Sequence, residues 1–166
     1  MRIELLFDDI STLDVDCIVN AAKPSLMGGG GVDGAIHRKA GPELREFCKT
    51  LGGCKVGEAK ISPGFNLKAK SIIHTVGPGY LFKNEKEELA LKQCYHSVLG
   101  LAAENNIATL AFSNISTGAY GFPKALAAKI SWETIAEHIE RNEYPTKVII
   151  CCFDRENFEI YKNLMR

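Results

Sequence analysis

Short apolar runs rich in Val and Ile alternate with longer amphipathic segments along this chain, and this alternation restricts the fold more than any other feature. The runs occupy residues 3–7, 17–21, 59–63, 71–76, 109–115 and 148–153. Their length and composition predict strands. Residues 86–104 and 128–139 repeat apolar positions at steps of three and four, which predicts helices. Because the last two runs are almost continuously apolar, we expect an α/β protein, a three-layer α/β/α sandwich with a mixed, largely parallel central sheet.

Length and charge restrict the class of protein further. A chain of 166 residues can bury about two thirds of the surface of its unfolded form, so we expect a single domain over residues 1–166. Lys and Arg number 20, as do Asp and Glu, so the formal net charge is zero. This balance argues against nucleic acid or membrane as the main partner. The first residues lack the pattern of a signal peptide, and 18 consecutive apolar residues occur nowhere. We therefore expect a cytoplasmic protein.

The cysteines and histidines carry no metal-binding pattern. The six cysteines lack C-x-x-C spacing, and Cys151 and Cys152 are adjacent within an apolar run. Such cysteines are expected to be reduced and mostly buried. The four histidines are scattered, without H-E-x-x-H or paired Cys/His spacing. We expect neither a metal nor another cofactor.

Three unusual loops follow predicted strands: residues 20–34, 77–80 and 115–121. In an open α/β sheet, ligands bind beyond the carboxyl ends of the strands. The first loop contains Gly28–Gly31 and precedes a helix predicted to begin near Asp33 or Gly34. Unobstructed backbone N–H groups at a helix N-terminus favour phosphate, and Gly118 and Gly121 repeat the device. Neither loop has the P-loop or dinucleotide-binding pattern. The alternative is that both are tight turns that need glycine at positive φ.

Four segments together extend over nearly the whole chain: VDCIVNAAKPSLMGGGGVDGAIHRKAGPEL, SIIHTVGP, ISTGAYGFP and CFDRENFEIY. They resemble the macrodomain family, whose members bind ADP-ribose. The similarity is greatest to the bacterial and mitochondrial branch, which includes ADP-ribosyl hydrolases and O-acetyl-ADP-ribose deacetylases. The resemblance implies the α/β/α fold and a ligand, either ADP-ribose or an ADP-ribosylated protein. We expect the chain to act as a monomer.

The resemblance assigns roles to three polar residues. Asp9 matches the acid that accepts a hydrogen bond from the adenine amine, with Ile10 beside the ring; without the family, Asp9 reads as a solvated acid or turn former. Asn20 matches the asparagine that binds the distal ribose, and its alternative is an Asx turn ending the strand. Asp33 matches the acid that aligns the attacking water. Its alternative is a helix N-cap.

The remaining implied contacts surround the diphosphate and the distal ribose. Tyr120 is expected to cover the distal ribose, and Phe153 to lie near the adenosine half, although a Phe at that position also suits a core. Side chains at Gly28–Gly31 would obstruct the ligand. The ligand-binding residues that the resemblance implies are Asp9, Ile10, Asn20, Gly28, Gly29, Gly30, Gly31, Val32, Ser116, Thr117, Gly118, Ala119, Tyr120, Gly121 and Phe153.

Lys23 is the main departure from the family, because it stands where a second asparagine is expected; Asp8, in place of a glycine, is a milder one. Asparagine offers a donor and an acceptor, whereas a lysine ammonium offers only donors. Lys23 can turn to solvent, pair with Asp33, or reach the diphosphate. The sequence thus supports a hydrolase of ester-linked ADP-ribose with Asp33, Asn20 and Lys23 at its catalytic centre. The alternatives are a binding module without hydrolysis, and an RNA-associated or structural module, which the neutral charge disfavours.

Overall fold

A mixed six-stranded sheet forms the middle layer of the computed structural model, which describes residues 2–166. The strands are β1 (Ile3–Phe7), β2 (Cys17–Ala21), β3 (Ala59–Pro63), β4 (Ser71–Thr75), β5 (Thr109–Phe112) and β6 (Lys147–Cys152). Their order across the sheet is β1-β6-β5-β2-β4-β3, and only β3 runs antiparallel to its neighbour. This confirms the predicted mixed, largely parallel sheet.

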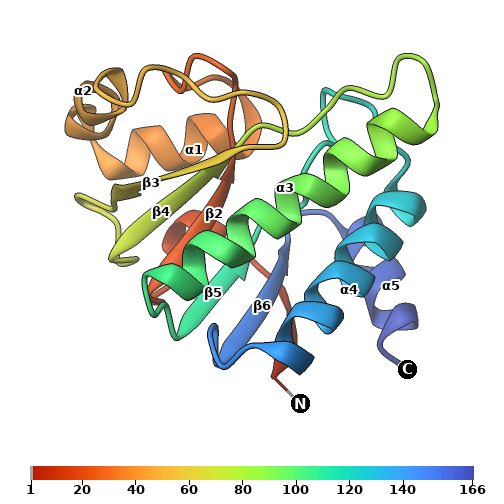
Figure 1. Ribbon diagram of the computed structural model, residues 1–166. Coiled ribbons are helices and arrows are strands. Elements are labelled where there is room, and N and C mark those ends of the chain that lie inside the picture. Colours follow the sequence, from red (N-terminus) through yellow and green to blue (C-terminus); the bar gives the residue numbers. More distant parts are fainter. Residues whose placement is uncertain (1) are drawn as a thin grey trace.

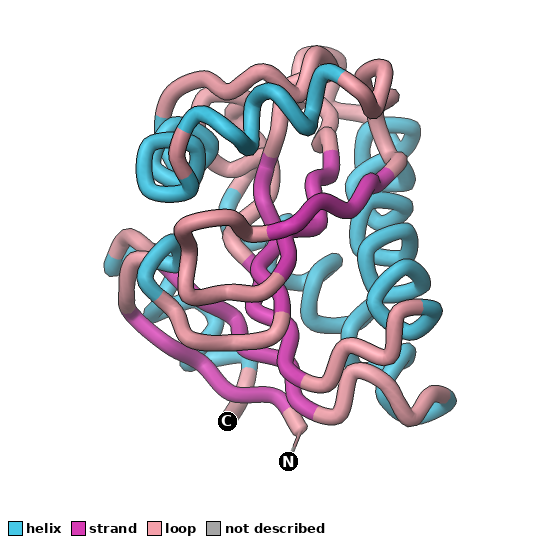
Figure 2. Tube along the Cα trace, turned by 90° about the vertical axis from the view of Figure 1, so that its left-hand side faces the viewer, coloured by secondary structure: helices cyan, strands magenta, loops and turns pink. Residues whose placement is uncertain are grey.

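Helices cover both faces of the sheet (Figures 1 and 2). They are α1 (Gly31–Ala40), α2 (Pro42–Lys49), α3 (Glu85–Glu104), α4 (Lys124–Arg141) and α5 (Arg155–Leu164), together with a short 3₁₀ helix at Ile10–Thr12. Buried residues of α3, α4 and α5 share one apolar cluster, and those of α1 and α2 share the other. The predicted three-layer α/β/α sandwich is therefore confirmed.

Alternation along the strands builds these two clusters. In β2, Cys17 and Val19 face the cluster of α3, whereas Ile18 faces that of α1. β6 repeats the pattern over Val148–Cys152 because successive side chains of a strand point to opposite faces. All six cysteines are buried and none forms a disulfide, as the sequence predicted.

The helix ends show how the sequence starts each element. Asn84 caps α3 in a capping box with Glu87, whose side chain accepts from the Asn84 N–H. Asp154 caps α5 by accepting from the Asn157 N–H. One predicted boundary is wrong by a few residues, because α1 begins at Gly31, before Asp33. Pro123 is the N-cap of α4.

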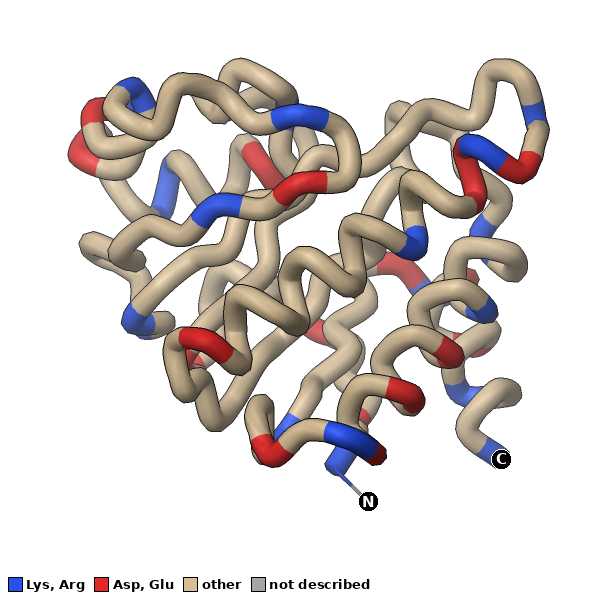
Figure 3. Tube along the Cα trace, viewed as in Figure 1, with Lys and Arg blue, Asp and Glu red and all other residues tan. Residues whose placement is uncertain are grey.

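The parallel strands bring their carboxyl ends to one edge of the sheet, where the predicted glycine-rich loops leave β2 and β5. Basic and acidic residues are interspersed along the chain in Figure 3, in keeping with the zero net charge. Within residues 2–166, no helix is long and apolar enough to cross a membrane.

Candidate ligand-binding and catalytic site

Two adjoining cavities lie at this edge of the sheet. The larger has a volume of about 590 Å³ and the smaller about 280 Å³. Both are lined by Gly31, Val32, Asn114 and Gly118, so they form two halves of one cleft. Residues that follow β1, β5 and β6 line the larger half, and residues that follow β2 and β5 line the smaller one. The loop at 77–80, predicted to share this site, lines neither half; its Tyr80 N–H donates to the Tyr120 carbonyl beside the cleft.

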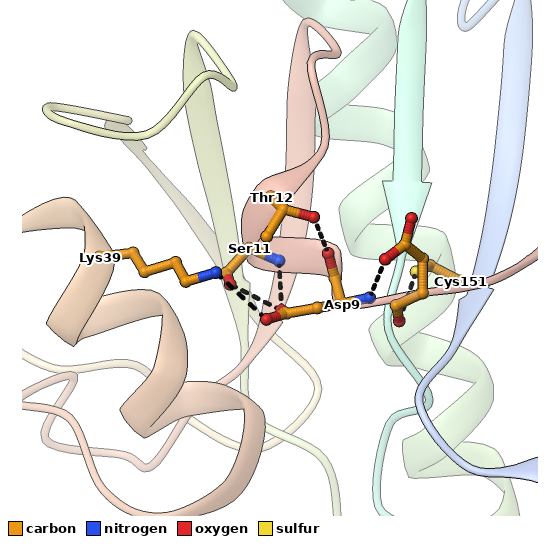
Figure 4. Close-up of polar contacts among 6 residues, drawn as sticks. Asp9, Ser11, Thr12, Lys39 and Cys151 are labelled. Atoms are coloured by element: carbon orange, nitrogen blue, oxygen red, sulfur yellow. Dashed lines mark hydrogen bonds and ion pairs between the residues drawn. The ribbon is translucent and has the colours of Figure 1, made fainter.

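Asp9 lines the larger cavity, and Ser11 and Lys39 hold its carboxylate in place (Figure 4). Its Oδ1 accepts from the Ser11 N–H at 3.0 Å and from the Ser11 hydroxyl at 2.6 Å, and its Oδ2 lies 3.3 Å from Lys39 Nζ. The hydrogen bond from the Ser11 side chain lowers the pKa of Asp9 below its ordinary value. Asp9 thus caps the 3₁₀ helix, as the turn-former interpretation requires, and still lines the cavity with Ile10.

The four consecutive glycines do different things. Gly28 and Gly31 have φ values of +90° and +57°, which L side chains rarely adopt. Gly30 and Gly31 line the cleft, whereas Gly28 and Gly29 do not. A Cβ on Gly30 would meet no atom within 4 Å. The tight-turn interpretation therefore holds for Gly28 and Gly31, whereas Gly30 lines the cleft and leaves space for a side chain within the fold.

The N-terminus of α1 opens into the cleft. Gly30 is its N-cap and provides no side-chain hydrogen bond, and the first helical N–H to find a backbone partner is that of Gly34, bonded to Gly30. The N–H groups of Gly31 and Val32 are therefore among the four without intrahelical partners. They carry the positive end of the helix dipole to the wall that both cavities share.

Asp33 and Asn20 form a buried pair below the smaller cavity. The Asn20 Nδ2 donates to Asp33 Oδ1 at 2.8 Å, and His37 Nε2 lies 3.5 Å from the same oxygen. Asp33 lines the smaller cavity, but Asn20 is fully buried and lines neither. Within the described chain, Asp33 Oδ2 and Asn20 Oδ1 have no hydrogen-bond partner. The alternative roles are wrong: Asp33 is the third residue of α1 rather than its cap, and Asn20 lies within β2 rather than in an Asx turn.

The loop after β5 forms the opposite wall. Ser116 has a φ of +66° and packs against Gly77, where a Cβ would overlap its hydroxyl. Ser116, Ala119 and Tyr120 line the smaller cavity, and Thr117 lines the larger. Gly121 lines neither; its φ of +68° turns the chain toward Phe122. This loop is therefore shaped partly by turn requirements and partly by the cleft.

Phe153 and Lys23 lie in different halves of the cleft. Phe153 is 72% exposed and lines the larger cavity, so its interpretation as a core residue is wrong. Lys23 is exposed and lines the smaller cavity. Its Cε lies 2.7 Å, and its Nζ 3.1 Å, from the position of a Cβ on Gly29. No ion pair joins Lys23 to Asp33 in the part of the chain that the structure describes, so of its possible roles the pairing is not observed.

Several residues of the cleft were not predicted. They are Asp8, Ala21, Ala22, Ala35, Arg38, Ser113, Asn114, Lys124, Cys151, Asp154 and Asn157. Asn114 could have been found, because it lies at the end of the strand predicted over 109–115, next to the predicted loop. The residues on helices gave no such signal. No cluster of three or more His, Cys, Asp or Glu suited to a metal ion occurs among residues 2–166.

Comparison with known proteins identifies the family of this chain. The model of the Macro domain matches residues 19–131. An O-acetyl-ADP-ribose deacetylase of Enterobacter sp. (strain 638) is 49% identical over 99% of this chain and 93% of its own length. The ADP-ribose glycohydrolase MACROD2 of Xenopus laevis is 51% identical over 93% of this chain and 37% of its own length.

Solved structures of macrodomains are also similar to this chain. A glycine-to-valine mutant of the Oceanobacillus iheyensis macrodomain with ADPR matches with a TM-score of 0.94 and 37% identity, over 98% of this chain and 91% of that one. A Trypanosoma brucei macrodomain in complex with ADP-ribose matches with a TM-score of 0.92 and 37% identity, over 99% and 69%. The family model spans more than half of the sequence, and the curated relatives are aligned with almost all of this chain, so this chain belongs to the macro domain family.

Proposed function

We propose that this protein binds ADP-ribose and hydrolyses ADP-ribose esters, formed either with acidic side chains or with acetate. The observation that carries the proposal is the Asp33 carboxylate, which lines the smaller cavity with one oxygen fixed by Asn20 and the other without a protein partner. Relatives named as an O-acetyl-ADP-ribose deacetylase and an ADP-ribose glycohydrolase support the same reaction class.

The two halves of the cleft suit the two halves of ADP-ribose. We assign adenosine to the larger cavity, with Asp9 accepting from the adenine amine and Phe153 beside the ring. The diphosphate then lies against the wall that the cavities share, where N–H groups of the first turn of α1 favour an anion. The distal ribose enters the smaller cavity, between Asp33 and Tyr120.

The chemistry requires one aligned water. Asp33 Oδ2 accepts a hydrogen bond from that water and, as it attacks, its proton. The water oxygen forms a bond to the ester carbon, the bond from that carbon to the leaving oxygen breaks, and Asp33 returns the proton to the leaving oxygen, so the products are ADP-ribose and the free carboxylic acid. Contacts of the diphosphate with the wall that the two cavities share hold the ester close to the water, so positioning contributes much of the rate. Asn20 acts through Asp33 by fixing the orientation of its carboxylate.

A second function, ADP-ribose binding without hydrolysis, is favoured by Lys23. The ammonium next to Gly29 supplies no acceptor for water or ribose. A charge-assisted contact with phosphate would strengthen binding by roughly 1.5 to 3 kcal/mol. Lys23 would then increase affinity at the expense of turnover.

Release of ADP-ribose from a mono-ADP-ribosylated acidic protein separates the two functions. We expect release by the wild-type protein, with accumulation of free ADP-ribose in proportion to enzyme. The same preparation is titrated with ADP-ribose by calorimetry. Binding without release would favour the binding module, and absence of both would contradict the assignment of the cleft.

We further propose that the chain acts on ADP-ribosylated proteins as a cytoplasmic monomer consisting of one domain, residues 1–166. The hydrogen bonding of β1 to β6, near opposite ends of the sequence, supports a single folding unit. The six unbridged cysteines suit a reducing compartment.

A further inference from the structure

A row of buried polar side chains continues behind Asp33 through three neighbouring strands. Asn20 on β2 lies directly opposite His74 on β4 in the register of the sheet, and Asn20 Nδ2 is 3.1 Å from His74 Nδ1. On the other side of the imidazole, Nε2 is 2.8 Å from the hydroxyl oxygen of Ser62 on β3. Ser62, His74, Asn20 and Asp33 are each at most 5% exposed. Buried polar groups are costly unless they are hydrogen-bonded, so this row demands an explanation.

The available protons fix the direction of each hydrogen bond in the row. The amide nitrogen of Asn20 only donates, and one of its hydrogens is directed to the Asp33 carboxylate. Its other hydrogen requires a lone pair on His74 Nδ1, so the imidazole proton lies on Nε2 and is donated to the Ser62 hydroxyl. Burial, with a smaller contribution from His37, lowers the pKa of His74 to about 3, which keeps the ring neutral.

The opposite orientation of the Asn20 amide would place its carbonyl oxygen against the Asp33 carboxylate, two acceptors without a proton between them. An amide can rotate by half a turn with little change in shape, so packing alone does not choose between the orientations. The Ser62 hydroxyl donates its one proton to the Pro63 carbonyl at 3.2 Å, so it accepts from His74 Nε2, and the lone pair of the ring lies on Nδ1. This lone pair selects the orientation of the Asn20 amide, because it accepts from nitrogen and repels oxygen.

We propose that His74 is a positioning residue for hydrolysis: by accepting from Asn20, it holds the Asn20 amide with its nitrogen toward Asp33 and so fixes the carboxylate that aligns the attacking water. Ser62 supports it by binding the Nε2 proton. This inference depends on the proposed hydrolase function. His74 itself lines neither cavity and acts only through Asn20 and Asp33.

The experiment compares two substitutions that both remove the imidazole. His74→Asn keeps a carbonyl oxygen near the position of Nδ1 and can still accept from Asn20, whereas His74→Leu cannot. We expect His74→Leu to lower kcat by about 10- to 100-fold, as misplacement of a catalytic group does, with little change in the Kd of ADP-ribose. We expect His74→Asn to recover most of the rate. Equal rates for the two variants would overturn the proposal.

Two further measurements cover the case in which His74→Leu does not fold. Ser62→Ala removes the partner of the Nε2 proton without removing the ring, and we expect a lower kcat with unchanged affinity. In the wild-type protein, ¹⁵N NMR should show His74 with Nε2 protonated and Nδ1 unprotonated; a proton on Nδ1 would contradict the row. If wild-type protein releases no ADP-ribose, the hydrolase function fails. If wild-type protein releases ADP-ribose and His74→Leu releases it equally fast, only the role of His74 fails.

Discussion

Lys23 places an ammonium group beside the backbone of Gly29, where the family resemblance leads us to expect an asparagine amide. The position of Lys23 on the wall of the smaller cavity puts this group within the proposed distal-ribose site. Because it forms no ion pair with Asp33 within the described residues, Lys23 changes the site chiefly by the acceptor that it lacks.

We therefore expect Lys23→Asn to raise ester hydrolysis by about tenfold, which needs only ~1.4 kcal/mol of transition-state stabilisation. ADP-ribose affinity should fall or stay level. Single-turnover hydrolysis with saturating enzyme measures this, because it removes differences in affinity. A loss of activity would show that the lysine has a catalytic or phosphate-holding role of its own, and equal rates would show that it points away from the substrate.

Asp9 illustrates how one side chain serves both structure and ligand. In Asp9→Asn the amide oxygen can keep the hydrogen bonds from Ser11, so the NH₂ group replaces Oδ2, cannot accept from the adenine amine and loses the contact with Lys39. We expect weaker ADP-ribose binding while the fold is retained. The control is Asp14→Asn, an exposed acid outside the cleft. Calorimetric titration of both variants tests the assignment, and equal affinities would remove Asp9 from the adenine site.

Among single residues, those on loops after strands were easier to predict than those on helices. The resemblance indicated Asp9, Tyr120 and Phe153, and all three line the cleft. Lys124 and Asn157 also line it, but they reach it from α4 and α5. The approach of these helices depends on long-range packing, for which a local sequence pattern gives no signal.

At the scale of elements, the strands were predicted best and short helices worst. The run at 109–115 contains β5 but extends beyond it, because Ile115 is apolar and buried although it belongs to the loop. The helix α2 buries only Leu44 and Cys48, and two buried positions do not make a visible period. The helix α5 likewise buries only Asn157 and Tyr161. Their existence follows from packing more than from pattern.

The loop after β5 offers the sharpest test of the cleft. Gly118 lines both cavities, and a Cβ there would meet no atom within 4 Å, so a side chain fits the fold. Gly118→Glu would direct a carboxylate toward the proposed diphosphate, and we expect ADP-ribose binding to be abolished. Gly100→Glu is the matched control, since Gly100 also has open space but lies on α3, away from the cleft. Circular dichroism checks that both variants fold. Retained binding by Gly118→Glu would contradict the diphosphate assignment.

At the scale of the whole molecule, buried histidines make stability depend on pH. Burial lowers the pKa of His74 from an ordinary value of 6.5 to about 3, and burial also lowers the pKa of His37. Below pH 6.5 the unfolded chain binds protons that the folded chain does not. Stability is therefore fully present above the unfolded pKa and is lost as pH falls from 6.5 toward 3, by up to about 1.4 kcal/mol per pH unit for each proton.

We expect the free energy of unfolding to fall between about pH 6.5 and pH 4.5. Urea titrations of wild type, His74→Asn and His96→Gln at several pH values measure the slope. His74→Asn should have a shallower slope than wild type, and His96→Gln, which alters an exposed histidine, should match wild type. Equal slopes for wild type and His74→Asn would contradict the neutral, buried state of His74.

The central claim is that the Asp33 carboxylate aligns the water that hydrolyses the ADP-ribosyl ester. The most direct measurement is single-turnover release of ADP-ribose from a mono-ADP-ribosylated acidic protein, with enzyme in excess, for wild type and Asp33→Ala. We expect the variant to be slower by roughly 10²- to 10⁴-fold, as for a lost acid–base group, while calorimetry shows that it still binds ADP-ribose. A variant that releases ADP-ribose as fast as wild type would contradict the account.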